Sequence, residues 1–182
     1  MWFPAHVAIG YVIGRKTALD TRWCVLGSIV PDLVDKTLGS LGVFPAYQTV
    51  SHSLLGLSVV AALLFGRYGP PTVGVAVGWT AHLAADVLQL FVNGRGDHAV
   101  AMLGWPVLHW ENPMVVDPSA AYAEGLFASI PFVQEGYVRY YLALPAFYLE
   151  LVILAYAVWL LAFDPAVTPA LDGRGTNGEG AR

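Results

Sequence analysis

Apolar stretches, separated by polar or Gly/Pro-rich residues, predict four or five helices along this chain of 182 residues. The first two, residues 3–14 and 22–36, are shorter than the about 20 residues that a membrane-spanning helix needs. Pro31 lies inside the second stretch, where a proline is expected to kink or break the helix. These two segments are therefore expected to pack as short helices.

Three further segments follow. The first, Leu54–Tyr68, comes directly after Ser51 and Ser53, either of which can cap a helix. The second covers about Thr72–Val92. The third, Leu142–Phe163, has 22 residues with a single acid and is the clearest candidate for a transmembrane helix.

The segments between and after these helices differ in composition. Residues 93–141 are rich in Gly, Pro, Trp and charged residues, which indicates a long loop with short helical pieces at a membrane interface. Residues 164–182 are rich in Pro and Gly and predict a flexible tail. The sequence thus predicts an all-α, membrane-embedded bundle of about four to five helices over residues 1–163.

Composition strengthens the membrane interpretation. Apolar residues make up 57% of the chain and charged residues 12%, whereas soluble domains have about 25% charged residues. We therefore expect a multi-pass protein of the cell membrane, with the lipid bilayer as its partner. The nine Lys and Arg residues are scattered, which argues against a nucleic-acid partner. One cysteine excludes an intrachain disulfide and a four-cysteine zinc site.

Several acids and histidines lie inside or beside the apolar stretches, where burial costs several kcal/mol unless the groups are paired or bind a metal. His82 and Asp86 are four residues apart, so both lie on one helical face within reach of one cation. Imidazole and carboxylate together suit zinc or another first-row metal. With a histidine from the first helix, the candidate ligands come from four segments, as in metal sites built inside helical bundles: His6, Asp32, His52, His82 and Asp86.

Each candidate also has a simpler interpretation. Asp32 could cap a helix that restarts after Pro31, and Asp35 could form an ion pair with Lys36 at a helix end. Two acids one turn apart, however, repel each other unless a cation or proton lies between them. His52, in Ser-His-Ser, could be an exposed or capping residue. A single histidine such as His6 is more often an interior residue than a ligand.

Other polar residues are weaker candidates. Residues 93–117 contain four groups that could line a substrate opening or complete a second metal site, although a solvated loop is favoured: Asp97, His98, His109 and Glu111. Glu150, inside the last apolar stretch, could contact a ligand's ring nitrogen or lie near an interface.

The order of these motifs resembles the YdjM-type family of membrane-bound, predicted metal-dependent hydrolases. The resemblance covers about residues 1–110, on these positions: His6, Pro31-Asp32, His52-Ser53, His82, Asp86 and Gly104-Trp105-Pro106. That family is similar to zinc-dependent phospholipase C and P1 nuclease, all-helical enzymes that cleave phosphodiester bonds. The resemblance implies that Asp32, His52, His82 and Asp86 hold one metal, and that His6 touches a second, which Asp86 bridges. A later His-x-x-x-Glu ligand pair has no counterpart here, which argues against a three-metal cluster.

We therefore predict an integral membrane hydrolase with one or two divalent ions, most plausibly Zn²⁺. It would cleave a phosphoester bond in a lipid or membrane-proximal substrate by metal-activated water, because a bound divalent ion lowers the pKa of water from 15.7 to about 7. Asp32 or Asp35, whichever is not a ligand, would take the proton. The alternative is a non-enzymatic membrane protein that uses the same groups for ion or proton passage, or as a structural metal clamp.

Overall fold

The computed structural model describes residues 1–44, 48–65, 69–108 and 144–164, and within these ranges the chain is helical, without strands. This confirms the predicted all-α class. The elements are α1 (Phe3–Lys16), α2 (Thr21–Ser40), the short 3₁₀ helix η1 (Val50–His52), α3 (Leu54–Phe65), α4 (Pro70–Val92), α5 (Gly96–Leu103) and α8 (Pro145–Phe163).

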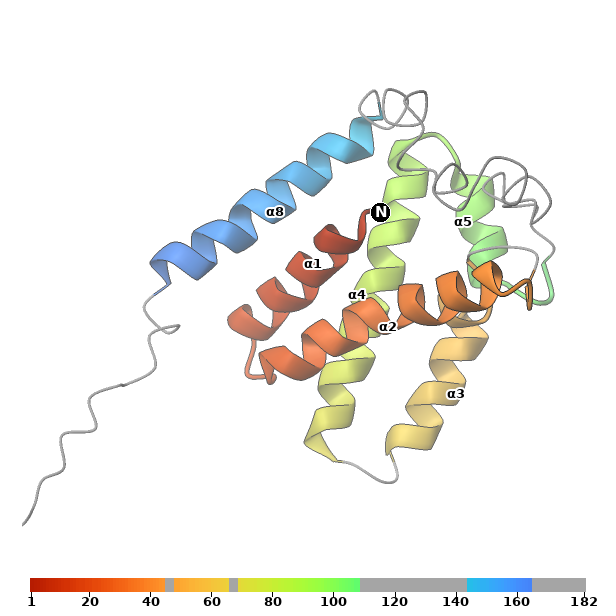
Figure 1. Cartoon of the computed structure of the whole chain (residues 1–182), viewed down its shortest axis with the longest axis horizontal. Helices are drawn as coiled ribbons and strands as arrows, with labels where there is room; N and C mark the ends of the chain where they lie inside the picture. Colours follow the sequence, from red (N-terminus) through yellow and green to blue (C-terminus); the bar gives the residue numbers. More distant parts are fainter. Residues whose placement is uncertain (45–47, 66–68, 109–143, 165–182) are drawn as a thin grey trace, which may run out of the picture.

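Helix α4 is the centre of the bundle and contacts α1, α2, α3, α5 and α8 (Figure 1). Helices α1 and α2 follow each other along the chain and both pack on α4, while α8 lies beside α1. The 3₁₀ helix η1 contacts α2 and α3. The Trp79 indole N–H of α4 donates to the Ser51 carbonyl, 2.8 Å away, and ties η1 to the central helix. Elements far apart in sequence therefore meet around the middle of α4.

Two glycines allow α2 and α4 to approach closely. A Cβ at Gly78 of α4 would overlap the Cys24 carbonyl oxygen of α2. A Cβ at Gly27 of α2 would in the same way overlap the Val75 carbonyl of α4. The two backbones are thus in contact with no room for a side chain, which sets the separation of the helices that carry most of the candidate ligands.

Pro31 lies inside its helix and does not end it, so of the two expected effects, a kink or a break, the break does not occur. Helix α2 begins after Asp20, whose side chain accepts from the Arg22 N–H at 2.8 Å, and continues past Pro31 to Ser40. The Ser51 hydroxyl donates to the Pro31 carbonyl at 2.7 Å, so packing against η1 supports this turn. The interpretation of Asp32 as the cap of a restarted helix is therefore wrong.

Other boundaries agree more closely with expectation. Ser53 caps α3, because its hydroxyl accepts from the Gly56 N–H at 3.0 Å. Helix α5 is a short helical piece inside the predicted loop of residues 93–141. The rest of that loop beyond residue 108, and the predicted tail after residue 164, lie outside the described residues.

Within the described ranges, two helices are long and apolar enough to cross a membrane, over Pro71–Val92 of α4 and Pro145–Phe163 of α8. Helix α8 has the higher mean hydropathy, 2.1, and only 22% of its apolar window is buried inside the protein. Its outward face carries large apolar side chains such as Leu151, Val152 and Trp159. A face of this kind is typical of contact with lipid or with another protein.

We predict that Gly78→Val destabilises the protein by about 1–3 kcal/mol, because the added side chain forces α2 and α4 apart. Ala84→Val is the matched control, since Ala84 is an exposed residue of the same helix. Thermal unfolding of the purified protein in detergent measures the difference. Equal melting temperatures for the two variants would contradict the close contact.

Candidate metal centre

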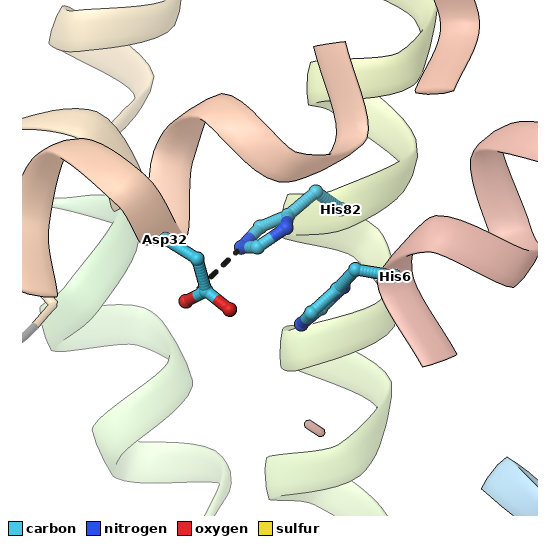
Figure 2. Close-up of side chains that lie close together, drawn as sticks. All are labelled: His6, Asp32 and His82. Carbon is cyan, nitrogen blue, oxygen red and sulfur yellow. Dashed lines mark ion pairs between the residues drawn. The ribbon is translucent and has the colours of Figure 1, made fainter. Parts of the chain in front are cut away.

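Five predicted ligands converge in the middle of the bundle. His6 comes from α1, Asp32 from α2, His52 from η1, and His82 and Asp86 from α4, and none is more than 3% exposed. Figure 2 shows three of them, with the His6 and His82 rings side by side and Asp32 facing His82. Two overlapping groups have ligand atoms within 4.8 Å of one another. They are His6, Asp32 and His82, and His52, His82 and Asp86.

Hydrogen bonds set which ring nitrogens face the centre. His82 Nδ1 lies 2.7 Å from the Ser28 carbonyl, which can only accept, so Nδ1 carries the proton and donates. His52 Nδ1 lies 2.8 Å from Asp35 Oδ2 and donates to that carboxylate. The Nε2 atoms of the two rings are therefore directed at each other, 3.0 Å apart. Histidine ligands of metals are held in this way, by a carbonyl or carboxylate behind the ring.

Two carboxylate oxygens complete the arrangement. Asp86 Oδ2 lies 3.4 Å from His52 Nε2 and 3.5 Å from His82 Nε2. Asp32 Oδ1 lies 3.5 Å from His52 Nε2 and 4.0 Å from His82 Nε2. Ligand atoms about 2.0–2.2 Å from a tetrahedral zinc ion are separated by about 3.3 Å. His52 Nε2, His82 Nε2 and Asp86 Oδ2, which lie 3.0–3.5 Å from one another, could therefore hold one ion, with Asp32 Oδ1 beside the two histidines.

His6 lies on the other side of Asp86. Its ring stacks on His82 with 3.7 Å between centroids, and its Nε2 lies 3.2 Å from Asp86 Oδ1. Both ring nitrogens of His6 are buried and make no hydrogen bond within the described part of the chain. The Met1 nitrogen contacts the same oxygen at 3.0 Å. Asp86 therefore directs Oδ1 at His6 and Oδ2 at His52 and His82, so its carboxylate could contribute to holding an ion on either side.

Asp35 lies behind His52 and is fully buried. Its carboxylate accepts from the Thr49 N–H at 2.6 Å and the Ser51 N–H at 3.2 Å, besides His52 Nδ1. Burial disfavours the ionised form, but the hydrogen bonds from His52 and these two amides outweigh it and lower the pKa of Asp35. An ionised Asp35 with both oxygens occupied positions the His52 ring.

The charge balance of the cluster calls for a cation. Burial alone would lower the pKa of His52, but hydrogen bonds with Asp32 and Asp35 raise it to about 10. Three buried carboxylates, those of Asp32, Asp35 and Asp86, thus lie around the His52 and His82 rings. The Met1 ammonium at Asp86 and Lys36 at Asp32 supply part of the balancing positive charge, and a proton on His52 or a metal ion supplies more.

Lys36 pairs with a different acid from the one expected. Its Nζ lies 2.7 Å from Asp32 Oδ2, one helical turn away, rather than beside Asp35. The prediction of an Asp35–Lys36 pair is wrong because adjacent residues point in different directions on a helix, whereas residues four apart are neighbours. The Asp32 oxygens consequently have different partners, with Oδ1 toward the histidines and Oδ2 toward Lys36.

The weaker candidates lie elsewhere. His98 accepts from the Arg95 Nε at 2.8 Å and lies 3.8 Å from Asp97, near the start of α5. Glu150 is buried between α8 and the chain's first residues, where it accepts from the Trp2 N–H at 3.3 Å. The matching Gly104-Trp105-Pro106 segment follows α5. His109 and Glu111 lie outside the described residues.

Several groups around the centre carry no signal in the sequence. The Ser28 carbonyl and the Thr49 and Ser51 amides are backbone groups, which every residue has. The Gln48 side chain donates to Asp86 Oδ2 at 3.1 Å, and an isolated glutamine in a loop gives no reason to expect this. These partners become visible only when η1 is placed against α2 and α4.

Comparison of the chain with protein-family models, with curated proteins and with solved structures finds no match.

We predict that the protein binds a divalent metal and that His82→Ala and His52→Ala each abolish this binding, because each removes a ligand atom from the group formed by His52, His82 and Asp86. Elemental analysis of the purified protein measures the metal content. His98→Ala is the control, since His98 lies with Arg95 and Asp97 and not in the cluster. Full metal content in the His82→Ala variant would contradict the proposed site.

We predict that Asp35→Asn weakens metal binding by about 10- to 100-fold, because the amide no longer provides an anionic acceptor for His52 Nδ1. Asp97→Asn removes the same charge at a side chain that is 80% exposed and serves as the control. Competition with a chelator of known affinity measures the change. Unchanged affinity would show that Asp35 does not position the ligand.

Proposed function

We propose that this chain is an integral membrane hydrolase whose buried His/Asp cluster holds one or two divalent ions, most plausibly Zn²⁺, and cleaves a phosphoester bond. The observation that carries the proposal is that His52 Nε2 and His82 Nε2 lie 3.0 Å apart, with Asp86 Oδ2 and Asp32 Oδ1 each 3.4–4.0 Å from both of them. Burying these carboxylate and imidazole groups so close together without a cation would cost free energy.

The resemblance to the YdjM-type family belongs to the same proposal. The five positions that resemble its ligands come from four separate elements, and they lie together in the fold. A chance resemblance of short motifs gives no reason for such proximity. The proposal that the chain is related to these predicted hydrolases is therefore supported by the geometry of its own residues.

The residues have separate roles in this proposal. A divalent cation at the centre would supply an activated water and polarise a phosphoryl oxygen. His52, His82 and Asp86 hold the site, and Asp35 fixes the orientation of the His52 ring. Asp32 Oδ2 accepts from one flexible side chain, Lys36, whereas the oxygens of Asp35 accept from His52 and two backbone amides. Asp32 is accordingly the better candidate for the general base.

The location of the site bears on the substrate. His82 and Asp86 belong to Pro71–Val92, one of the two segments that could cross a membrane. Ionisable residues inside such a segment are typical of substrate or ion sites close to the bilayer. We therefore propose a phospholipid or a membrane-proximal phosphoester as the substrate, and a multi-pass location in the cell membrane.

The 3.0 Å contact between His52 Nε2 and His82 Nε2 also suits a second function, the passage of a proton between imidazoles. A structural clamp, in which the metal only joins the helices, uses the same ligands. Metal analysis separates the proton pathway from both metal-dependent functions. Turnover then separates the hydrolase from the clamp.

We predict that the metal-loaded protein hydrolyses a phosphodiester, and that Asp32→Asn lowers kcat at least about 100-fold, in the range expected for loss of a general base. The assay uses a soluble chromogenic phosphodiester and short-chain phospholipids in detergent. Asp97→Asn is the control for the charge change. A metal-loaded wild-type protein without turnover on either substrate would favour the structural clamp.

A further inference from the structure

Lys36 is the basic residue that reaches the centre. The chain has only two lysines, Lys16 and Lys36. Among the Lys and Arg side chains of the described residues, Lys36 alone forms an ion pair with a cluster carboxylate, at 2.7 Å from Asp32 Oδ2. Arg15 and Lys16 pair instead with Asp164, at the far ends of α1 and α8.

The exposure of Lys36 marks where the cluster meets the surface. The side chains of the five candidate ligands are almost fully buried, whereas the Lys36 side chain is 43% exposed. Its ammonium contacts Oδ2 of Asp32, while Oδ1 of the same carboxylate faces the histidines. Lys36 thus lies on the outer side of the centre, between its ligands and the surroundings.

The charges explain what an ammonium group does at this position. Asp32, Asp35 and Asp86 carry three negative charges, the Met1 ammonium lies 3.0 Å from Asp86 Oδ1, and the Lys36 ammonium lies 2.7 Å from Asp32 Oδ2. At Asp32, the outer carboxylate, Lys36 thus places a positive charge where an approaching anionic phosphoryl group would otherwise meet a negative one. Once Asp32 shares its charge with a cation, its attraction for the ammonium weakens, and the flexible four-carbon side chain can turn to a new anion.

We propose, on the basis of the function proposed above, that Lys36 is the residue that binds the anionic phosphoryl group of the substrate at the mouth of the metal centre. Lysine is a regular phosphate-binding residue, which acts as a point charge with three donors. The phosphoryl group belongs either to a lipid headgroup or to a free phosphoester.

The test measures anion binding rather than turnover. Inorganic phosphate is titrated calorimetrically into the metal-loaded full-length protein in neutral detergent. Lys36→Gln should raise the Kd for phosphate about tenfold or more, while its metal content stays at the wild-type level. Lys36→Arg should restore most of the affinity, because it restores the charge. Lys16→Gln is the matched control, since Lys16 is 46% exposed and lies away from the centre.

A second arm distinguishes the two sources of the anion. Dihexanoylphosphatidylcholine, kept below its micelle concentration, replaces inorganic phosphate. A Lys36-dependent Kd for both probes supports a lipid headgroup, and a Lys36-dependent Kd for phosphate alone supports a free phosphoester.

Three results would overturn the proposal. They are the same phosphate affinity in Lys36→Gln as in the wild type, no phosphate binding by the metal-loaded wild type, and loss of the metal in Lys36→Gln. The last would make Lys36 a structural partner of Asp32. A wild-type protein that binds no metal at all is a different outcome, because it refutes the proposed function itself.

Discussion

The burial of three carboxylates and three imidazoles in one apolar bundle is the constraint on which this structure depends. Each such group would cost several kcal/mol if it were buried alone. In the bundle each of them contacts another member of the cluster or a backbone group, as Asp35 does with two amides and His82 with the Ser28 carbonyl. The buried carboxylates also need positive charge close to them, and a bound metal ion would supply it.

The helix packing and the site are parts of the same arrangement. Gly27 and Gly78 bring α2 and α4 into backbone contact, and this approach places the Ser28 carbonyl within 2.7 Å of His82 Nδ1. The proton on Nδ1 in turn leaves Nε2 to face His52. Small residues at a helix crossing therefore determine the tautomer of a histidine one or two turns away, and with it the availability of a ligand atom.

The two oxygens of each central carboxylate have different surroundings. Asp86 faces His52 and His82 with one oxygen and His6 with the other. Asp32 faces the histidines with Oδ1 and Lys36 with Oδ2. The centre thus has an inner side, enclosed by α1 and α4, and an outer side on α2 where a charged side chain reaches solvent. An anionic substrate would meet the outer side first.

Much of this could be predicted from the sequence, because local physical rules apply to it. Apolar runs of sufficient length specify helices, and the rarity of charges in them singles out acids and histidines whose burial needs a partner. The spacing of His82 and Asp86 places both on one helical face whatever the helix packs against. The all-α class and the five candidate ligands follow from such rules.

The pairing of these groups depended on the tertiary structure. Whether Asp35 contacts Lys36 or His52, and whether Pro31 breaks a helix or is supported by Ser51, depends on where η1 packs against α2. The Ser28 carbonyl and the Thr49 and Ser51 amides are backbone groups, which a sequence does not distinguish from those of other residues. They nevertheless orient the His82 ring and the Asp35 carboxylate. Hydrogen bonds act over about 3 Å, so only the placement of distant segments side by side decides which of them form.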